Sequence, residues 1–517
     1  MSERRKMLFI IIDQLRADCV SGALAEHVKL TNINAFRQDA VTFTQHFSVT
    51  NPCGPARASI LTGKYAMNHR SIRNGTPMSD GMPNMAREMR KSGYDPVLFG
   101  YTDTSIDPRT RHPNDPDLKT EESVLPDFKE VLEMRYLQSY PWRAYLKSKG
   151  YDIPDYSRFH DPISPNPKRP ARADDPPFFK AKDSDTAFLT DSVINYLSVR
   201  TDENWFAMAT YLRPHPPLVA PKPYNRMYKG SKLPLPERME TPEQESAVHP
   251  FIAGAIDSPP MQKIIRGDGV LVDSKNDKDV QMLRAIYLGL ATEVDTHIGR
   301  IIAFLKETDQ YDQTLIVLTA DHGEMLGDHH MWGKQHVYDP AFRAPLIIRD
   351  PENPAQHGTS VTSLTESIDV TPTILDLMGR QVPDSMDGRS LRPFLEGKQP
   401  DKWKDCVHLE LDFGQPNEPT AAQKATGLDL KECNFVILRE QRFKLVHFNG
   451  GLPPLLFDLD NDPFEMQNLA DDPAHAGTLM RLTQKLLSHR MKHADHTLSG
   501  LRVTENGVVG QKVEQRV

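Results

Sequence analysis

Five short apolar runs, separated by segments of helical periodicity, constrain the fold of this chain more than any other feature. They span residues 7–13, 96–102, 205–212, 314–321 and 344–350. Such continuous apolar runs are typical of strands that are buried on both faces of a parallel sheet. Helical patterns accompany them at 190–199, 277–308 and 367–379. Strands that alternate with helices predict an α/β fold with a doubly wound, mainly parallel sheet.

Two stretches rich in proline and charge interrupt this pattern, at 101–185 and 214–276. We expect them to be long insertions that form lids, substrate walls or oligomer contacts, with disorder as the alternative. Towards the C-terminus the pattern changes to short strands, two of which are separated only by Gln441 and Arg442, a spacing typical of a hairpin. The predicted division is a catalytic domain at 1–400, a smaller α+β subdomain at 401–494 and an arm at 495–517.

The bulk composition limits the partners and the compartment. A net charge of −8 over 517 residues argues against nucleic acid or an anionic membrane as the main partner, but it allows a small anionic substrate. The first apolar run ends at Asp13 and is too short for a secretory signal, and no stretch approaches the roughly 18 apolar residues of a membrane span. Four scattered cysteines are not a disulfide framework. We therefore expect a cytoplasmic protein.

Polar residues follow several of the predicted strands. In open parallel sheets, ligands bind outside the carboxyl ends of the strands. Asp13 follows the first strand, and Asp321 and His322 follow the fourth, which predicts a divalent metal site. A helix N-cap is the alternative for Asp13. The other residues at strand ends are Tyr101, Thr102 and His215.

The stretch NPCGPARASILTG, residues 51–63, contains the cysteine that carries most information. Alone, Cys53 would be read as a small buried residue near a turn. The string CGPAR followed by TG, together with Asp13, DHGE and SIDVTPTILDLMG, resembles the C-x-P-x-R signature of the type I sulfatases in the alkaline phosphatase superfamily. The likeness is closer to the bacterial phosphonate monoester hydrolases that also cleave aryl sulfates, through stretches such as GYTDTSIDPRT, RPHPP and DHGEMLGDHHMWGK. Together with PPLLFDLDNDPFEMQNLA, these stretches are spread from just after the first strand to the C-terminal subdomain, so the likeness extends over most of the chain. It implies an alkaline-phosphatase-like fold.

The resemblance implies a particular chemistry for Cys53. In that family a separate formylglycine-generating enzyme converts the cysteine to formylglycine. The aldehyde hydrate carries two hydroxyls on one carbon: one attacks sulfur or phosphorus, and the other then expels the anion. The expected activity is hydrolysis of small anionic esters, namely sulfate monoesters, phosphonate monoesters and also phosphate diesters.

The resemblance also implies a metal site. The implied ligands are Asp13, the modified Cys53, Asp321 and His322. Gln14 stands where many sulfatases have a second Asp, which lowers the charge of the site, and His322 replaces an Asn. Both changes favour Mn²⁺ over Ca²⁺, although Ca²⁺ stays possible.

Four further residues are expected to face the substrate by resemblance. Arg57 would hold the hydrate or the developing oxyanion, because its planar fork of donors suits that role. His215 would protonate the leaving group, and Lys334 would contact an oxyanion. Asn74 resembles a polar pocket residue of the phosphonate hydrolases. The alternatives are a structural histidine, a surface lysine and a turn asparagine.

The segment GYDPVLFGYTD, residues 93–103, departs from the sulfatase pattern. Tyr101 stands where sulfatases commonly have Lys, as in the phosphonate hydrolases, and Asp103 replaces a His. We expect Asp103 either to point away, which would leave Thr102 or Thr104 to donate, or to recognise a cationic group. Fewer positive charges suit a singly charged ester.

Three other functions stay open. One is a phosphodiesterase or phosphomutase of the same superfamily with unmodified Cys53, and another is a catalytically silent metal-binding scaffold. A cysteine hydrolase built on Cys53, His322 and Asp321 is disfavoured, because no glycine-lined oxyanion hole is evident nearby. The resemblance and the polar arm also predict a homo-oligomer, either a dimer or a tetramer.

Overall fold

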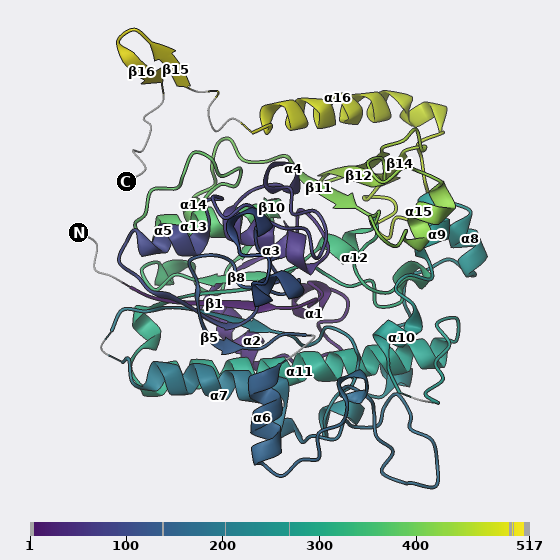
Figure 1. Ribbon diagram of the computed structural model, residues 1–517. Coiled ribbons are helices and arrows are strands. Elements are labelled where there is room, and N and C mark those ends of the chain that lie inside the picture. Colours follow the sequence, from purple (N-terminus) through teal and green to yellow (C-terminus); the bar gives the residue numbers. More distant parts are fainter. Residues whose placement is uncertain are drawn as a thin grey trace.

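The computed structural model describes residues 5–136, 139–201, 203–267, 269–495, 499 and 501–510. Parts of the predicted arm 495–517 therefore lie outside the described residues. The central element is a sheet of eight strands in the order β5-β4-β6-β1-β7-β8-β2-β9 (Figure 1). The strands are β1 (Lys6–Ile12), β2 (Val41–Phe43), β4 (Pro96–Gly100), β5 (Lys129–Glu133), β6 (Phe206–Tyr211), β7 (Thr314–Ala320), β8 (Leu346–Arg349) and β9 (Ser360–Val361).

The central strands run parallel. β1 lies between β6 and β7, and it pairs with both of them in parallel register. β4 likewise pairs in parallel with β6 and with β5. β8 is the exception, because it runs antiparallel to β7 and to β2. The predicted fold of a mainly parallel, doubly wound sheet is confirmed, and all five predicted strands belong to it.

Helices cover both faces of this sheet. Alternate side chains of β1 enter two different hydrophobic clusters, so the strand is buried on both sides. Figure 1 shows one layer on either side of the sheet. The first cluster includes side chains from α2 (Thr31–Gln38), α7 (Asp185–Ser198) and α11 (Asp277–Glu307). The second includes side chains from α3 (Cys53–Thr62), α5 (Met85–Arg90) and α13 (Val370–Leu377).

The proline-rich insertions contain elements that the sequence analysis did not predict. The first insertion adds β5 to the edge of the sheet, next to β4. It also contains α6 (Tyr140–Ser148), and the second contains α8 (Pro242–Ser246), α9 (Pro250–Ala255) and α10 (Met261–Ile264). These elements are short and lie within sequence rich in proline and charge, so the alternation of strands and helices does not mark them.

The C-terminal part forms a separate antiparallel sheet of four strands. They are β11 (Cys406–Asp412), β12 (Asn434–Glu440), β13 (Phe443–Phe448) and β14 (Leu455–Asp458), paired in chain order. β12 and β13 form the hairpin that the spacing at Gln441 and Arg442 predicts. One face of this sheet packs against residues of the loop that follows β7, including Met325 and Tyr338. The sheet therefore supports that loop.

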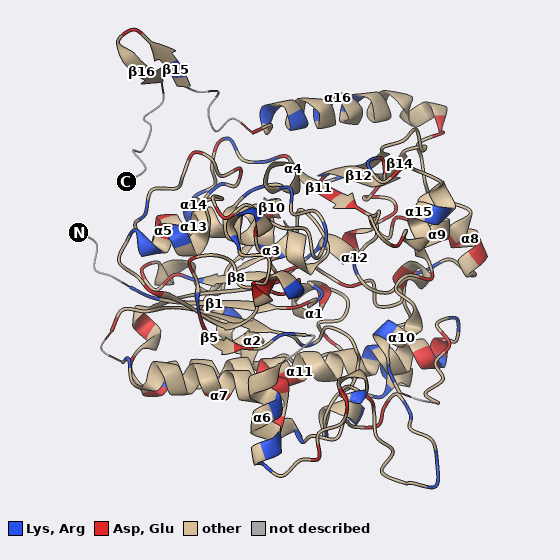
Figure 2. Cartoon of the chain, viewed as in Figure 1, with Lys and Arg blue, Asp and Glu red and all other residues tan. Residues whose placement is uncertain are grey.

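The helix α16 (Ala476–Lys492) covers the other face of this sheet through Leu482 and Leu486. All of its charged residues are basic (Figure 2). Arg481 and Lys485 form ion pairs with Glu440 at 2.8 and 2.6 Å. Beyond it, β15 (Leu501–Thr504) and β16 (Gly507–Gly510) form a hairpin, which stands apart from the body in Figure 1.

Within the described residues, no helix has both the length and the apolar character that crossing a bilayer requires.

The end of α16 is held by stacked histidines. His489 lies 4.7 Å from His408 of β11 and 4.4 Å from His493, measured between ring centroids. Burial and the nearby Lys404 lower the pKa of His489 to about 4. The folded state therefore binds a proton at His489 less readily than the unfolded chain does. The contribution of His489 to the unfolding free energy is therefore fully present above the unfolded-state pKa of about 6.5. It is lost as the pH falls towards the pKa of the folded state.

We expect His489→Gln to flatten the acid side of the stability profile. Between pH 7 and pH 5 the wild type should lose roughly 1–2 kcal/mol more unfolding free energy than the variant, because glutamine does not titrate. Urea unfolding at the two pH values measures the difference. His447→Gln, at an exposed position on β13, should leave the wild-type dependence unchanged. Equal losses in the wild type and His489→Gln would contradict this reading of the stack.

Candidate active site

Cys53 is the first residue of α3, and its side chain is buried. Its Sγ lies 3.2 Å from Nε2 of His322 and 3.8 Å from Oδ1 of Asp13. Burial, reinforced by the charge of Asp13, raises the pKa of the thiol well above its ordinary value. The unmodified side chain is therefore a protonated thiol and a poor nucleophile.

Four potential ligand atoms converge at this point. Asp13 follows β1, while Asp321 and His322 follow β7, and these two strands are parallel neighbours whose carboxyl ends meet. The ligand atoms of these three residues and Cys53 all lie within 4.8 Å of one another. We call these four residues the donor set. In the described part of the chain, no other cluster of three or more His, Cys, Asp or Glu residues has this geometry.

Arg57, one turn along α3, joins the two carboxylates of the donor set. Its Nε donates to Asp321 at 2.9 Å and its Nη2 donates to Asp13 at 3.0 Å. Its Nη1 donates to the main-chain carbonyl of Tyr101 at 2.9 Å, and the side chain is fully buried. The sequence analysis assigned Arg57 to the hydrate or the oxyanion. In this structure the guanidinium orients the carboxylates.

The two carboxylates differ electrostatically. Asp321 accepts hydrogen bonds from Arg57 and from the backbone amides of Gln14 and His322, both at 3.0 Å. Although burial raises the pKa of Asp321, the charges of His322 and Arg57 outweigh it and lower the pKa to about 2. Burial and the neighbouring Asp321 raise the pKa of Asp13. Two carboxylates share one guanidinium, so the donor set favours an additional cation.

Tyr101 lies beside the donor set because of the turn at the end of β4. Gly100 has a φ of 114°, and a Cβ there would lie 2.1 Å from Oγ1 of Thr210, so only glycine fits. The Tyr101 hydroxyl donates to Asp13, and the Arg57 guanidinium lies 4.0 Å above the ring centroid.

Thr102, the next residue, points elsewhere. Its hydroxyl donates to the carbonyl of Ser123 at 3.0 Å and accepts from the amide of Leu125 at 2.8 Å. Thr104 donates to the carbonyl of Thr102 at 3.3 Å. Both hydroxyls therefore hold the first insertion in place, and the structure does not bring Thr102 into the donor set.

Lys334 reaches the donor set from the loop after β7. Its Nζ donates to Oε1 of Gln14 at 2.6 Å. Burial lowers the pKa of its ammonium group, but the nearby negative charges, including those of Asp13 and Asp321, outweigh burial and raise it. Lys334 is therefore a protonated cation at the site, which argues against the alternative of a surface lysine.

His215 and Asn74 complete the predicted group. Nδ1 of His215 lies 2.5 Å from the carbonyl oxygen of Pro216, and its ring packs on Tyr136 with 5.3 Å between centroids. Burial and the charge of Lys334 lower the pKa of His215 well below its ordinary value. Oδ1 of Asn74 accepts from the amide of Gly54 at 3.0 Å, next to Cys53.

Sequence reasoning gave no role to Glu324, although it lies in the DHGE run. This buried carboxylate accepts from the amides of Leu326 and Gly333 at 2.9 and 2.6 Å, and from the side chain of Gln14. It thus fixes both the loop that carries Lys334 and the amide that contacts Lys334. Its position two residues beyond a predicted ligand was the available signal.

Asp103 does not point into solvent. Its side chain is 6% exposed, and burial raises the pKa of its carboxyl well above the ordinary value. Its charge also acts on Cys53, and its main-chain carbonyl lies 2.8 Å from where a Cβ of Gly54 would be. The segment that begins at Asp103 therefore forms part of the wall around Cys53.

Comparisons with known proteins agree with this geometry. A profile of the family described as Sulfatase matches residues 5–380. A second profile, described as N-sulphoglucosamine sulphohydrolase, C-terminal, matches residues 327–492. The multifunctional alkaline phosphatase superfamily protein PehA of Trinickia caryophylli is 37% identical over 516 residues, which cover 98% of this chain and 99% of the relative.

Two solved structures are similar over nearly the whole chain. The phosphonate monoester hydrolase SpPMH from Silicibacter pomeroyi is 54% identical with a TM-score of 0.95, covering 98% of this chain and 99% of that one. The phosphonate monoester hydrolase of Agrobacterium radiobacter is 41% identical with a TM-score of 0.92, covering 99% and 100%.

Proposed function

This chain belongs to the sulfatase family of the alkaline phosphatase superfamily, and on that premise we propose that it is a metal-dependent hydrolase of sulfate monoesters and phosphonate monoesters. The nucleophile in this proposal is a formylglycine made from Cys53, and phosphate diesters are a further substrate class. The observation that carries the proposal is the approach of Cys53 to Asp13, Asp321 and His322, with all four ligand atoms within 4.8 Å of one another.

The donor set fits the groups that the family implies. Two carboxylates and the Nε2 atom of His322 suit a divalent cation such as Mn²⁺ or Ca²⁺. Such a cation would lower the pKa of a nearby hydroxyl and screen the charge of the ester. Formylglycine would supply, as its hydrate, two hydroxyls on one carbon at position 53.

Other residues of this chain would position the donor set and bind the substrate. Arg57 holds the carboxylates of Asp13 and Asp321 in place, so the donor set keeps its shape when no ester is bound. Lys334, anchored by Gln14, presents a positive charge to the anionic oxygens of the substrate. Binding energy is therefore directed to the part of the ester where negative charge grows.

His215 is the candidate for the proton that the leaving group needs. Its contact with the Pro216 carbonyl at 2.5 Å requires the proton on Nδ1, which leaves Nε2 as an acceptor. The negative charge of a bound ester raises the pKa of the ring. Nε2 can then take up a proton and pass it to the departing oxygen.

The charges around Cys53 favour a singly charged ester. Arg57 is committed to two carboxylates and a carbonyl, and Tyr101 and Asp103 stand where many sulfatases have Lys and His. A phosphate monoester dianion would therefore meet too few cations.

We expect this preference for singly charged esters to appear when four 4-nitrophenyl compounds are compared. They are 4-nitrophenyl sulfate, 4-nitrophenyl phenylphosphonate, the diester 4-nitrophenyl phenyl phosphate, and the monoester 4-nitrophenyl phosphate. The three singly charged esters should each exceed the monoester in kcat/KM by roughly tenfold or more, because the extra charge lacks a partner. Release of 4-nitrophenolate measures each rate. If the phosphate monoester were the best of the four, the proposed substrate class would be wrong.

Two alternative functions remain distinguishable from this one. A phosphodiesterase with unmodified Cys53 would need a reactive thiol, but burial raises the pKa of this thiol well above its ordinary value. A silent scaffold would not need Lys334 and His215 beside a complete donor set. Both observations support the enzyme with the modified residue.

The remaining parts of the proposal concern partners and location. We place the protein in the cytoplasm, with a formylglycine-generating enzyme as its maturation partner. All four cysteines are buried and unpaired, which supports a reducing compartment. The exposed Val503, Val508 and Val509 on the β15–β16 hairpin support assembly into a homo-oligomer, a dimer or a tetramer.

A further inference from the structure

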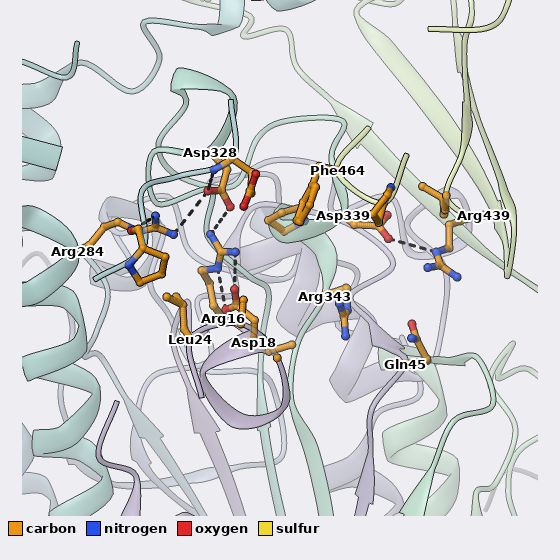
Figure 3. A pocket seen from close by; sticks show the side chains of 18 of the residues that line it. Arg16, Asp18, Leu24, Gln45, Arg284, Asp328, Asp339, Arg343, Arg439 and Phe464 are labelled. Atoms are coloured by element: carbon orange, nitrogen blue, oxygen red, sulfur yellow. Dashed lines mark hydrogen bonds and ion pairs between the residues drawn. The ribbon is translucent and has the colours of Figure 1, made fainter. Parts of the chain in front are cut away.

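A cavity of about 400 Å³ lies outside the donor set (Figure 3). Segments distant in the sequence form it, among them the residues after Gln14, the second insertion around Leu235, the short helix α12 (Asp339–Phe342) with Arg343, and the loop after β14. That loop belongs to the stretch PPLLFDLDNDPFEMQNLA, which the proposed reaction does not use. No residue of the donor set lines the cavity.

Three carboxylates that line this cavity are already paired with cations. Asp18 and Asp328 are paired with Arg16 at 2.6 and 2.7 Å. Asp339 is paired with Arg439 at 3.2 Å and also with the buried Lys444. Figure 3 shows the three carboxylates with Arg16 and Arg439, and dashed lines mark their ion pairs. These three carboxylates are therefore already paired with cations of the chain.

Arg343 differs from the other arginines of the cavity. Within the described residues, no carboxylate lies within 4.0 Å of its guanidinium, and its one hydrogen bond is from Nη2 to the carbonyl of Thr44 at 3.0 Å. Its Nε is buried without a hydrogen-bond partner, and the same holds for Oε1 of the neighbouring Gln45. In Figure 3 Arg343 lies between Asp18 and Gln45, with no interaction drawn to either. Arg343 is thus a desolvated cation whose donors are not satisfied.

The rim of the cavity is apolar. Leu235 is 50% exposed and Phe464 is 48% exposed, and both line the cavity. Leu24, Pro340 and Pro463 extend this surface. Exposed apolar side chains at the mouth of a concave site mark a place where a ligand buries an apolar body.

We propose that this cavity binds a small monocarboxylate with an apolar body. The carboxylate pairs with the guanidinium of Arg343, whose planar fork matches a carboxylate in two hydrogen bonds. The apolar body lies against Leu235 and Phe464. A monocarboxylate suits this single guanidinium better than a dianion such as phosphate does, because Arg16 and Arg439 are already paired with carboxylates. The site is separate from the proposed reaction, so it does not depend on the modification of Cys53.

Isothermal titration calorimetry of the purified full-length protein with octanoate tests this site. Octanamide, which has the same alkyl chain but no charge, is the control ligand. Octanoate should bind, and octanamide should bind roughly tenfold more weakly or worse, because it lacks the charge. Arg343→Met should lower the octanoate affinity by a similar factor. Arg172→Met, which removes an arginine that is 61% exposed on the first insertion, should leave the affinity unchanged.

Two further variants test the site independently of Arg343→Met. Leu235→Asp places a carboxylate at the exposed rim without disturbing the core, and it should weaken octanoate binding even if Arg343→Met proves unstable. Cys53→Ala should bind octanoate as the wild type does, since the donor set lies outside the cavity. The proposal is overturned if octanoate does not bind, if octanamide binds as tightly, if Arg343→Met or Leu235→Asp keeps full affinity, or if Cys53→Ala abolishes binding.

Discussion

Replacing Cys53 with alanine should lower kcat/KM for 4-nitrophenyl sulfate and phosphonate esters by more than about 10³-fold, as removal of a covalent nucleophile usually does. The two carboxylates of the donor set should stay in place, because Arg57 donates to both Asp13 and Asp321. The loss would therefore report the missing nucleophile and not a collapsed site. Cys406→Ala is the matched control, because that buried cysteine lies on β11, and it should retain near-normal turnover.

Mass spectrometry of the tryptic peptide spanning residues 38–57 links this loss to the modification. Active wild-type protein should show position 53 without its sulfur and with an added oxygen. The fraction of modified peptide should rise and fall with specific activity across preparations. An unmodified thiol in fully active protein, or near-normal turnover by Cys53→Ala, would contradict the proposed nucleophile.

The sequence predicted the fold well where burial alone decides the structure. The run MLFIIID places apolar side chains on both faces of β1, and the observed strand uses them alternately for two clusters. Asp13 and Asp321 were expected at one edge because both follow parallel strands. They meet because β1 and β7 are direct neighbours, and this order in the sheet depends on long-range packing that periodicity does not encode.

The predictions were weaker where side chains compete for partners. Arg57 was expected at the oxyanion, but its donors are taken by Asp13 and Asp321. Thr102 was a candidate donor to substrate, yet its hydroxyl bonds the first insertion. A sequence lists donors and acceptors, whereas the tertiary fold decides which of them are already satisfied. The sequence could not predict the cavity around Arg343 either, because its walls come from many segments that are distant in the chain.

We expect Asp321→Asn to lower both the amount of bound metal and the hydrolytic activity. The carboxylate of Asp321 accepts from Arg57, Gln14 and His322, and its pKa is lowered to about 2, so it stays ionised across the working range. Asparagine keeps the shape but removes the charge, which leaves Arg57 only Asp13 as a charged partner. We expect kcat/KM to fall by roughly 10³-fold or more, because several kcal/mol of charge stabilisation are lost.

The readout that separates this effect from a general loss of structure is bound metal per chain. Atomic emission after buffer exchange should show depletion in Asp321→Asn, while circular dichroism at 25 °C should show a folded protein. Asp103→Asn is the matched control: its carboxyl is also buried but lies outside the donor set, so this variant should keep its metal. If Asp321→Asn kept its full metal content with turnover within tenfold of the wild type, or if Asp103→Asn lost metal to the same extent, then the cation would not be held where the four ligand atoms converge.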